Sequence, residues 1–250
     1  MKKQPLIFTV AIGLFFTQLS SLQAEEEELR LSTLGCMLEP SEKVEISSPV
    51  MGVLDKVMVK RGDSVEKGQA LFQLKAGVER EGVQLAKVRA EFAKRKAQRN
   101  QDLYDDDILT ASERDEIETE LLIAKSELRL KQQELSLRKV SSPIKGVVVN
   151  RFNNAGEFVN TDPILSLATL DPLHVDLLLP ASYFGLVSLK QELLIKPESE
   201  TIDANTATVV IVDPLIDSAS GTFRVQLVMR NPDGNIPAGI RCTAQTISKP

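Results

Sequence analysis

Residues 47–53 read Ser-Ser-Pro-Val-Met-Gly-Val, and residues 141–147 read Ser-Ser-Pro-Ile-Lys-Gly-Val. The match continues at the same offset without a gap, since Gly62 corresponds to Gly156 and Leu71 corresponds to Leu165. An ungapped internal match of this kind is typical of duplicated structure. We take this duplication as the feature that decides the fold.

Each copy of the repeat has the composition of short β-strands joined by turns. β-Branched residues such as Val53 and Val57 favour strands. One copy alone could not bury its apolar face, so residues 47–76 and 140–169 are predicted to fold together as one small β-sandwich. We assign four glycines to turns that need a permissive backbone: Gly52, Gly62, Gly146 and Gly156.

Between the two copies, over residues 77–139, the hydrophobic period becomes helical. In a first helix near 78–104, apolar residues recur every seven positions, and smaller ones fill the same side. The recurring residues are Val78, Leu85 and Phe92, and the others are Ala86, Val88, Ala93 and Ala97. This pattern predicts that these residues form a coiled-coil seam.

A second helix near 112–139 shows the alternating 4-3 spacing of a coiled coil. Its series is Ile117, Leu121, Ala124, Leu128 and Leu135, broken at Lys131, with a second line of Ile123, Leu130 and Leu137. Thr110 and Glu113 have the spacing of a capping box, which would start this helix. We therefore predict an antiparallel helical hairpin with its tip at about residues 105–111.

Residues 170–247 are rich in strands. Val175, Leu177 and Leu179 alternate, 207–212 is a β-branched run, and 222–229 alternates again. Five or six strands separated by Gly and Pro turns predict a small antiparallel β-barrel. Residues 25–46 form an N-terminal segment with a lead strand near 29–38, and residues 248–250 form a tail. The predicted fold is mixed, mostly β, and elongated.

Residues 1–24 have the pattern of a secretory signal peptide. Lys2 and Lys3 precede an apolar run from Leu6 to Phe16, and small residues lead to a cleavage site after Ala24. The apolar run is shorter than the ~20 residues that span a bilayer. We expect a cleaved signal and a periplasmic location; an uncleaved anchor is the alternative.

Composition excludes several classes of function. With 42% hydrophobic residues the chain can bury a core, and with 4% aromatics and a net charge of −5 it lacks the features of a nucleic-acid-binding protein. It has one His, two Cys and no Trp. His174 has no second His or Cys near it in sequence, so we predict no metal site. We also predict no cofactor and no enzyme, which leaves a binding, carrier or scaffolding protein.

Cys36 and Cys242 are the only cysteines. In an oxidising compartment they are expected to form a disulfide that joins the lead strand to the last barrel strand. The alternative is two buried thiols.

The order strand, half-sandwich, helical hairpin, half-sandwich, barrel resembles the periplasmic adaptor family, also called membrane fusion or hemolysin-D-like proteins. Residues 48–71 and 140–148 are similar to the two lipoyl half-motifs of that family. Asp213-Pro214, residues 220–225 and residues 231–239 are similar to its barrel signature. The resemblance covers nearly the whole mature chain.

This resemblance implies an adaptor of a tripartite efflux pump, which bridges an inner-membrane transporter and an outer-membrane channel and assembles into a ring. In the branch that serves resistance-nodulation-division pumps, the hairpin tip carries Arg, Leu and Ser at fixed spacing. Arg99, Leu103 and Thr110 stand at those positions here, with Thr in place of Ser. They are the predicted channel contacts. Members of that branch usually continue into a membrane-proximal domain, which we expect to be abbreviated here or supplied by another subunit.

Two alternatives stay open. The adaptor could serve an ABC-type pump or a type I secretion exporter, although secretion adaptors tend to have far longer hairpins. Lys75 is similar to the modified lysine of lipoyl and biotinyl carriers. Those carriers place the lysine on the turn that joins two contiguous halves, whereas a helical segment occupies that place here, so we do not favour a carrier.

Overall fold

The computed structural model describes residues 33–106 and 108–246. The predicted signal peptide, the tail at 248–250 and residues 29–32 of the predicted lead strand lie outside the described residues. The described chain is mostly β with two helices. The strands are β1 (Gly35–Ser47), β2 (Gly52–Val57), β3 (Ser64–Val65), β4 (Ala70–Leu74), β5 (Lys139–Ser141), β6 (Gly146–Arg151), β7 (Phe158–Val159), β8 (Pro163–Pro180), β9 (Glu192–Pro197), β10 (Asn205–Val212), β11 (Thr222–Met229) and β12 (Cys242–Thr246).

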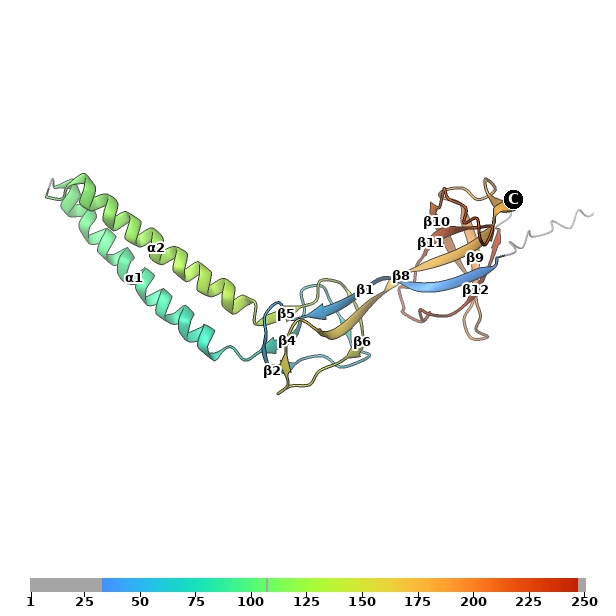
Figure 1. The fold of residues 1–250 in the computed structure, drawn as a ribbon, viewed down its shortest axis with the longest axis horizontal. Coiled ribbons are helices and arrows are strands. Elements are labelled where there is room, and N and C mark those ends of the chain that lie inside the picture. Colours follow the sequence, from blue (N-terminus) through green and yellow to red (C-terminus); the bar gives the residue numbers. More distant parts are fainter. Residues whose placement is uncertain (1–32, 107, 247–250) are drawn as a thin grey trace, which may run out of the picture.

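The molecule is long, with three parts in a row (Figure 1). The two helices extend from one end, a small β-sandwich lies in the middle, and a second β region, here called the C-terminal β region, lies at the other end. Strands β1 and β8 run together from the sandwich into the C-terminal β region.

The two repeat copies lie together in the sandwich. Strand β2 of the first copy pairs with β7 of the second, and β6 of the second copy pairs with β3 of the first. Strand β4 pairs with β5, so the second copy also continues the sheet of the first. One buried cluster contains residues from both copies, including Leu54, Leu71, Val148 and Leu165. Each copy therefore supplies half of a common core.

The four repeat glycines serve two purposes. Gly62 and Gly156 have φ of 91° and 94°, a left-handed backbone that favours glycine, so both lie in turns as predicted. Gly52 and Gly146 do not lie in turns, because they begin strands β2 and β6. A Cβ on Gly146 would lie 2.3 Å from the carbonyl oxygen of Ala168, so a neighbouring strand excludes any side chain there.

The C-terminal β region has its own core. Leu173, Val175, Leu177 and Leu179 of β8 are fully buried, and they pack with apolar residues of β1, β9, β10, β11 and β12. The strand order is β12-β9-β10-β11-β8, with β1 on β8. Since alternate residues of β8 point inward, the predicted alternation of these four residues is explained by one buried face.

This sheet is open rather than a closed barrel. Between β1 and β12 there is a single isolated bridge, Met37 with Arg241, instead of a strand ladder. Two backbone hydrogen bonds lie beside it: the N–H of Leu38 donates to the carbonyl oxygen of Ile240, and that of Gly239 donates to the carbonyl oxygen of Leu38. The predicted small antiparallel β-barrel is therefore corrected to an open sheet.

Helix α1 spans Gly77–Asp105 and helix α2 spans Ala111–Ser136. They are inserted between β4 and β5, which are paired neighbours in the sandwich. Both helices therefore leave the sandwich at one place and lie side by side (Figure 1). Among the described residues, neither helix is apolar enough over sufficient length to cross a membrane.

Candidate functional site: the helical pair and its tip

The two helices pack through small and branched residues. Ala90 and Ala93 of α1 are buried against Ala124 of α2, with Leu121 and Leu128 partly buried beside them. Ion pairs join the helices at two levels: Arg89 with Glu127 over 2.8 Å, and Lys96 with Glu120 over 2.6 Å. The partner number falls as the α1 number rises, so the helices are antiparallel.

The predicted seam is partly right for each helix, since the second predicted line of α2 is exposed. Leu121, Ala124 and Leu128 face α1, as their 4-3 spacing predicts. On α1 the contact is made by Ala90 and Ala93, and Ala86 is buried as well, whereas Leu85 and Phe92 are 55% and 54% exposed. One residue along a helix is a rotation of about 100°, so a seam that takes Ala86 and Ala93 leaves the preceding residues outside it.

This rotation creates two exposed lines of apolar residues, here called the apolar rows. One row is Val78, Leu85 and Phe92 on α1. The other row is Ile123 and Leu130 on α2 and Leu137, the residue that caps the end of α2. The antiparallel register set by the ion pairs places Phe92 level with Ile123 and Leu85 level with Leu130. Helical periodicity puts both rows on the face that the ion pairs cross, one on each side of them.

The tip of the pair is closed by backbone and capping hydrogen bonds. The carbonyl oxygen of Leu103 accepts from the N–H groups of Ile108 and Leu109, over 2.9 and 3.2 Å. Thr110 is the N-cap of α2: its hydroxyl accepts from the Glu113 N–H, and its own N–H donates to the Glu113 carboxylate over 2.9 Å. The predicted capping box is therefore confirmed.

Charge at the tip follows from these bonds. The backbone N–H of Thr110, and then its hydroxyl, donate to the Glu113 carboxylate and hold the pKa of that group below its ordinary value. Arg114 lies 4.5 Å above the ring of Tyr104, a cation–π contact across the two helices. A hydrogen bond to Glu118 is the main cause that raises the Arg114 pKa. The tip is thus braced from both helices.

The three predicted contact residues lie at this end. Arg99 is exposed on α1 and falls seven residues after Phe92, in line with that apolar row. Leu103 is 39% exposed in the last turns of α1, and Thr110 is exposed at the start of α2. Nearby Ile108 is 67% exposed. The tip therefore presents apolar and polar side chains to solvent together, and Ile108 is a tip residue that the sequence pattern did not single out.

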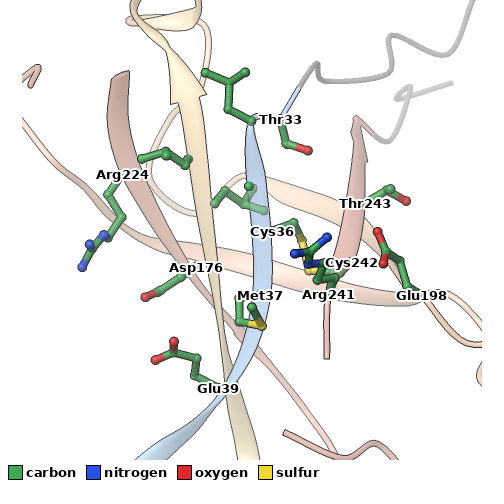
Figure 2. A pocket seen from close by; sticks show the side chains of 14 residues that line it. Thr33, Cys36, Met37, Glu39, Asp176, Glu198, Arg224, Arg241, Cys242 and Thr243 are labelled. Atoms are coloured by element: carbon green, nitrogen blue, oxygen red, sulfur yellow. A yellow bond between two sulfur atoms is a disulfide. The ribbon is translucent and has the colours of Figure 1, made fainter. Parts of the chain in front are cut away.

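At the other end of the molecule, Cys36 and Cys242 are joined by a disulfide. Figure 2 shows this bond between β1 and β12, beside a hollow lined by charged residues that include Arg224, Arg241 and Glu198. Both cysteines are buried. The bond connects the two strands that share only one bridge.

The remaining candidates carry no chemistry in this arrangement. Lys75 is exposed in the short link between β4 and α1, not on a turn that joins the repeat copies. His174 lies on β8 opposite Glu39 and Val228 and is half-buried. Within residues 33–106 and 108–246, no group of three or more His, Cys, Asp or Glu could hold a metal ion.

Comparison with known proteins identifies one family model. The model described as "CzcB-like, barrel-sandwich hybrid domain" matches residues 42–168. These residues contain both repeat copies and the helical pair between them.

Two curated proteins are similar to most of this chain. The antibiotic efflux pump periplasmic linker protein ArpA of Pseudomonas putida is 25% identical, covering 78% of this chain and 57% of its own length. Multidrug resistance protein MdtE of Escherichia coli K12 is 26% identical, covering 86% and 63%. The chain thus spans little more than half the length of such curated relatives.

Solved structures share the fold. A MacA-MexA chimeric protein containing the Pseudomonas aeruginosa MexA α-hairpin domain has a TM-score of 0.74 at 21% identity, covering 85% of this chain and 77% of the other. The membrane fusion protein Spr0693 of Streptococcus pneumoniae has a TM-score of 0.69 at 17% identity, covering 87% and 99%.

Proposed function

Since the chain belongs to the CzcB-like barrel-sandwich hybrid family of membrane fusion proteins, we propose that it is the periplasmic adaptor of a tripartite efflux pump. In this role it bridges an inner-membrane transporter and an outer-membrane channel. Proteins of this family are non-catalytic, so the work of the molecule is to connect and seal other proteins.

The observation that carries this proposal is the projection of the helical pair. The helices extend away from both β regions and bury only a narrow seam between themselves (Figure 1). A segment that buries so little adds little to the stability of the fold. Its length is explained if the exposed tip has to reach a partner.

The partner at the tip is an outer-membrane channel. Arg99, Leu103 and Thr110 contact it, together with the exposed side chain of Ile108. Leu103 and Ile108 supply apolar area for a helix-to-helix contact, and Arg99 supplies a charged hydrogen-bond donor. A resistance-nodulation-division transporter is the favoured inner-membrane partner, because the tip triplet follows that branch; an ABC-type or type I secretion exporter is the alternative.

Neighbouring copies of the chain pack side by side through the apolar rows and form a ring. The rows lie on one face of the helical pair. They lie outside the seam between α1 and α2, so the packing of the two helices leaves them exposed. Large apolar side chains that are exposed on one face of a helical pair are typical of an interaction surface.

The proposal also covers the form of the helical pair and the export of the chain. The helical pair acts as a coiled-coil hairpin, supported by the 4-3 spacing that α2 uses against α1. The chain is exported by a cleaved signal peptide and is held at the inner membrane through the transporter.

The substitution Leu103→Asp tests the tip contact. It places a charge in the apolar contact, so efflux and cross-linking to the channel should be lost while expression and helicity are unchanged. Leu122→Asp is the matched control, because Leu122 is an exposed leucine of α2 outside the tip and the apolar rows. Normal efflux with Leu103→Asp would contradict the proposed tip contact.

A further inference from the structure

Two short links hold the helical pair on the sandwich. Residues 75–76 connect β4 to α1, and residues 137–138 connect α2 to β5. Backbone hydrogen bonds reach up to these links, since the N–H of Leu74 donates to the carbonyl oxygen of Arg138 and the N–H of Lys75 donates to that of Val53, each over 2.8 Å. Hinges between parts of a protein lie at a few residues of this kind, at the ends of helices and strands.

Arg138 is the side chain that spans this hinge. Its Nη2 pairs with Oε1 of Glu79, in the first turn of α1, over 2.6 Å. Its Nη1 donates to the carbonyl oxygen of Met51, in the loop before β2, over 3.0 Å. One guanidinium therefore holds the start of α1 and the sandwich backbone together.

The Arg138–Glu79 pair differs from the other ion pairs found among the described residues. Those pairs lie between the two helices, within α2 or within the sandwich, and their side chains are at least 36% exposed. The side chains of Arg138 and Glu79 are 22% and 18% exposed. A charged pair that is more shielded from solvent is screened less by salt and holds its geometry better.

Gly52 makes room for this contact. A Cβ on Gly52 would lie 2.7 Å from Nη1 of Arg138, closer than van der Waals contact permits. Gly52 does not lie in a turn, so a turn does not explain why this position is glycine. A residue without a side chain lets the guanidinium of Arg138 lie against the backbone here. Lysine could not replace this arrangement fully, because an ammonium lacks the planar fork that reaches two acceptors at once.

We propose that Arg138, Glu79 and Gly52 form a latch that fixes the angle between the helical pair and the sandwich. Arg138 is a positioning residue, because it acts by deciding where the tip points. With the latch closed the helices keep one direction, and with it broken they swing on the two links. The relevance of this angle to bridging rests on the proposed function, whereas the latch itself is a property of the isolated chain.

The test measures the distribution of distances between a spin label on the sandwich and a spin label on the helical pair. Lys67 and Lys125 are both exposed, and each can be replaced by an amino acid that carries a ketone. Spin labels attached to the ketones do not react with cysteine, so the disulfide stays intact. Double electron–electron resonance should give a narrow distance distribution for the otherwise unchanged chain. Arg138→Gln, Glu79→Gln and Gly52→Ala should each broaden it about twofold, and Arg138→Lys should broaden it less.

The matched control is Arg129→Gln, which removes an arginine of α2 whose Nη2 donates to the Ser126 hydroxyl on the same helix. It should leave the width unchanged. Glu79→Gln changes a helix side chain outside both buried β cores, so it keeps the test valid if Arg138→Gln fails to fold. Equal widths for Glu79→Gln and the unchanged chain would overturn the latch. Because this readout needs neither transporter nor channel, a narrow distribution in a chain that never cross-links to a channel would contradict only the proposed function.

Discussion

The N–H of Gly62 donates to the carbonyl oxygen of Val148 over 2.9 Å, and the N–H of Val148 donates to the carbonyl oxygen of Asp63 over the same distance. The equivalent residues of the repeat make the reciprocal bonds: Gly156 donates to Leu54, and Leu54 donates to Glu157, over 2.8 and 2.9 Å. Each copy therefore completes the other by the same contacts. This symmetry lets the chain leave the sandwich for two helices and return without loss of the core.

Gly146→Ala tests the close approach within the sandwich. The new Cβ would collide with the carbonyl of Ala168, which is backbone and cannot rotate away. We expect a loss of about 1–3 kcal/mol in the free energy of unfolding, the usual range for overpacking. Urea denaturation measures it.

Gly82→Ala is the control for this substitution. Gly82 lies inside α1, and its added Cβ would lie 3.7 Å from the Lys131 side chain, an ordinary contact. Alanine favours a helix over glycine by about 1 kcal/mol, so this variant should be more stable than the parent. Equal effects of the two substitutions would contradict the account of Gly146.

Removal of the disulfide should destabilise the whole chain. The bond closes a loop between residues separated by 206 positions, for which the chain-entropy model gives about 5 kcal/mol. Cys36→Ser together with Cys242→Ser should lower the denaturation midpoint, and reduction of the parent should lower it equally. If unreduced, denatured protein takes up two alkyl groups, the bond is absent.

The capping box predicts a pH dependence for α2. The pKa of Glu113 is lowered in the folded chain, so the stabilisation it provides is complete above the unfolded pKa and is lost as the pH falls through the folded pKa. Helicity followed by circular dichroism on heating should fall more steeply with acid in the parent than in Glu113→Gln. Parallel curves would contradict this role of Glu113.

The proposed packing of copies through the apolar rows predicts that charged residues in these rows weaken self-association. Leu85→Glu with Leu130→Glu places charges at one level of both rows, so sedimentation should show weaker association than in the parent. Leu122→Glu introduces the same charge on an exposed α2 position outside the rows and should leave association unchanged. Monomers for parent and variants alike, with transporter and channel present, would contradict a ring built through these rows.

The sequence predicts the sandwich well because the repeat places equivalent residues in equivalent contacts. The strands β2 and β6 begin at Gly52 and Gly146, which the alignment already pairs. The alignment could not reveal what lies against these glycines, because the backbone of Ala168 and the side chain of Arg138 approach them from distant parts of the chain.

The sequence predicts the helical pair in outline, but it assigns the buried face of α1 only partly correctly. A period of seven fits Leu85 and Phe92 as well as Ala86 and Ala93, and larger apolar residues are the usual choice for a seam. The structure uses alanines, which leaves the larger residues exposed. The open side of the C-terminal β region was likewise hidden, since alternation reports a buried face but not whether the first and last strands pair.

In-cell photo-cross-linking from two positions tests whether this chain bridges two membrane proteins. A photoreactive residue at position 103 lies at the tip of the helical pair, and one at position 215 lies in the loop between β10 and β11, where Leu215 is 79% exposed. We expect position 103 to capture an outer-membrane channel and position 215 to capture an inner-membrane transporter. Capture of the same inner-membrane protein from both positions, with no channel trapped from position 103, would contradict it.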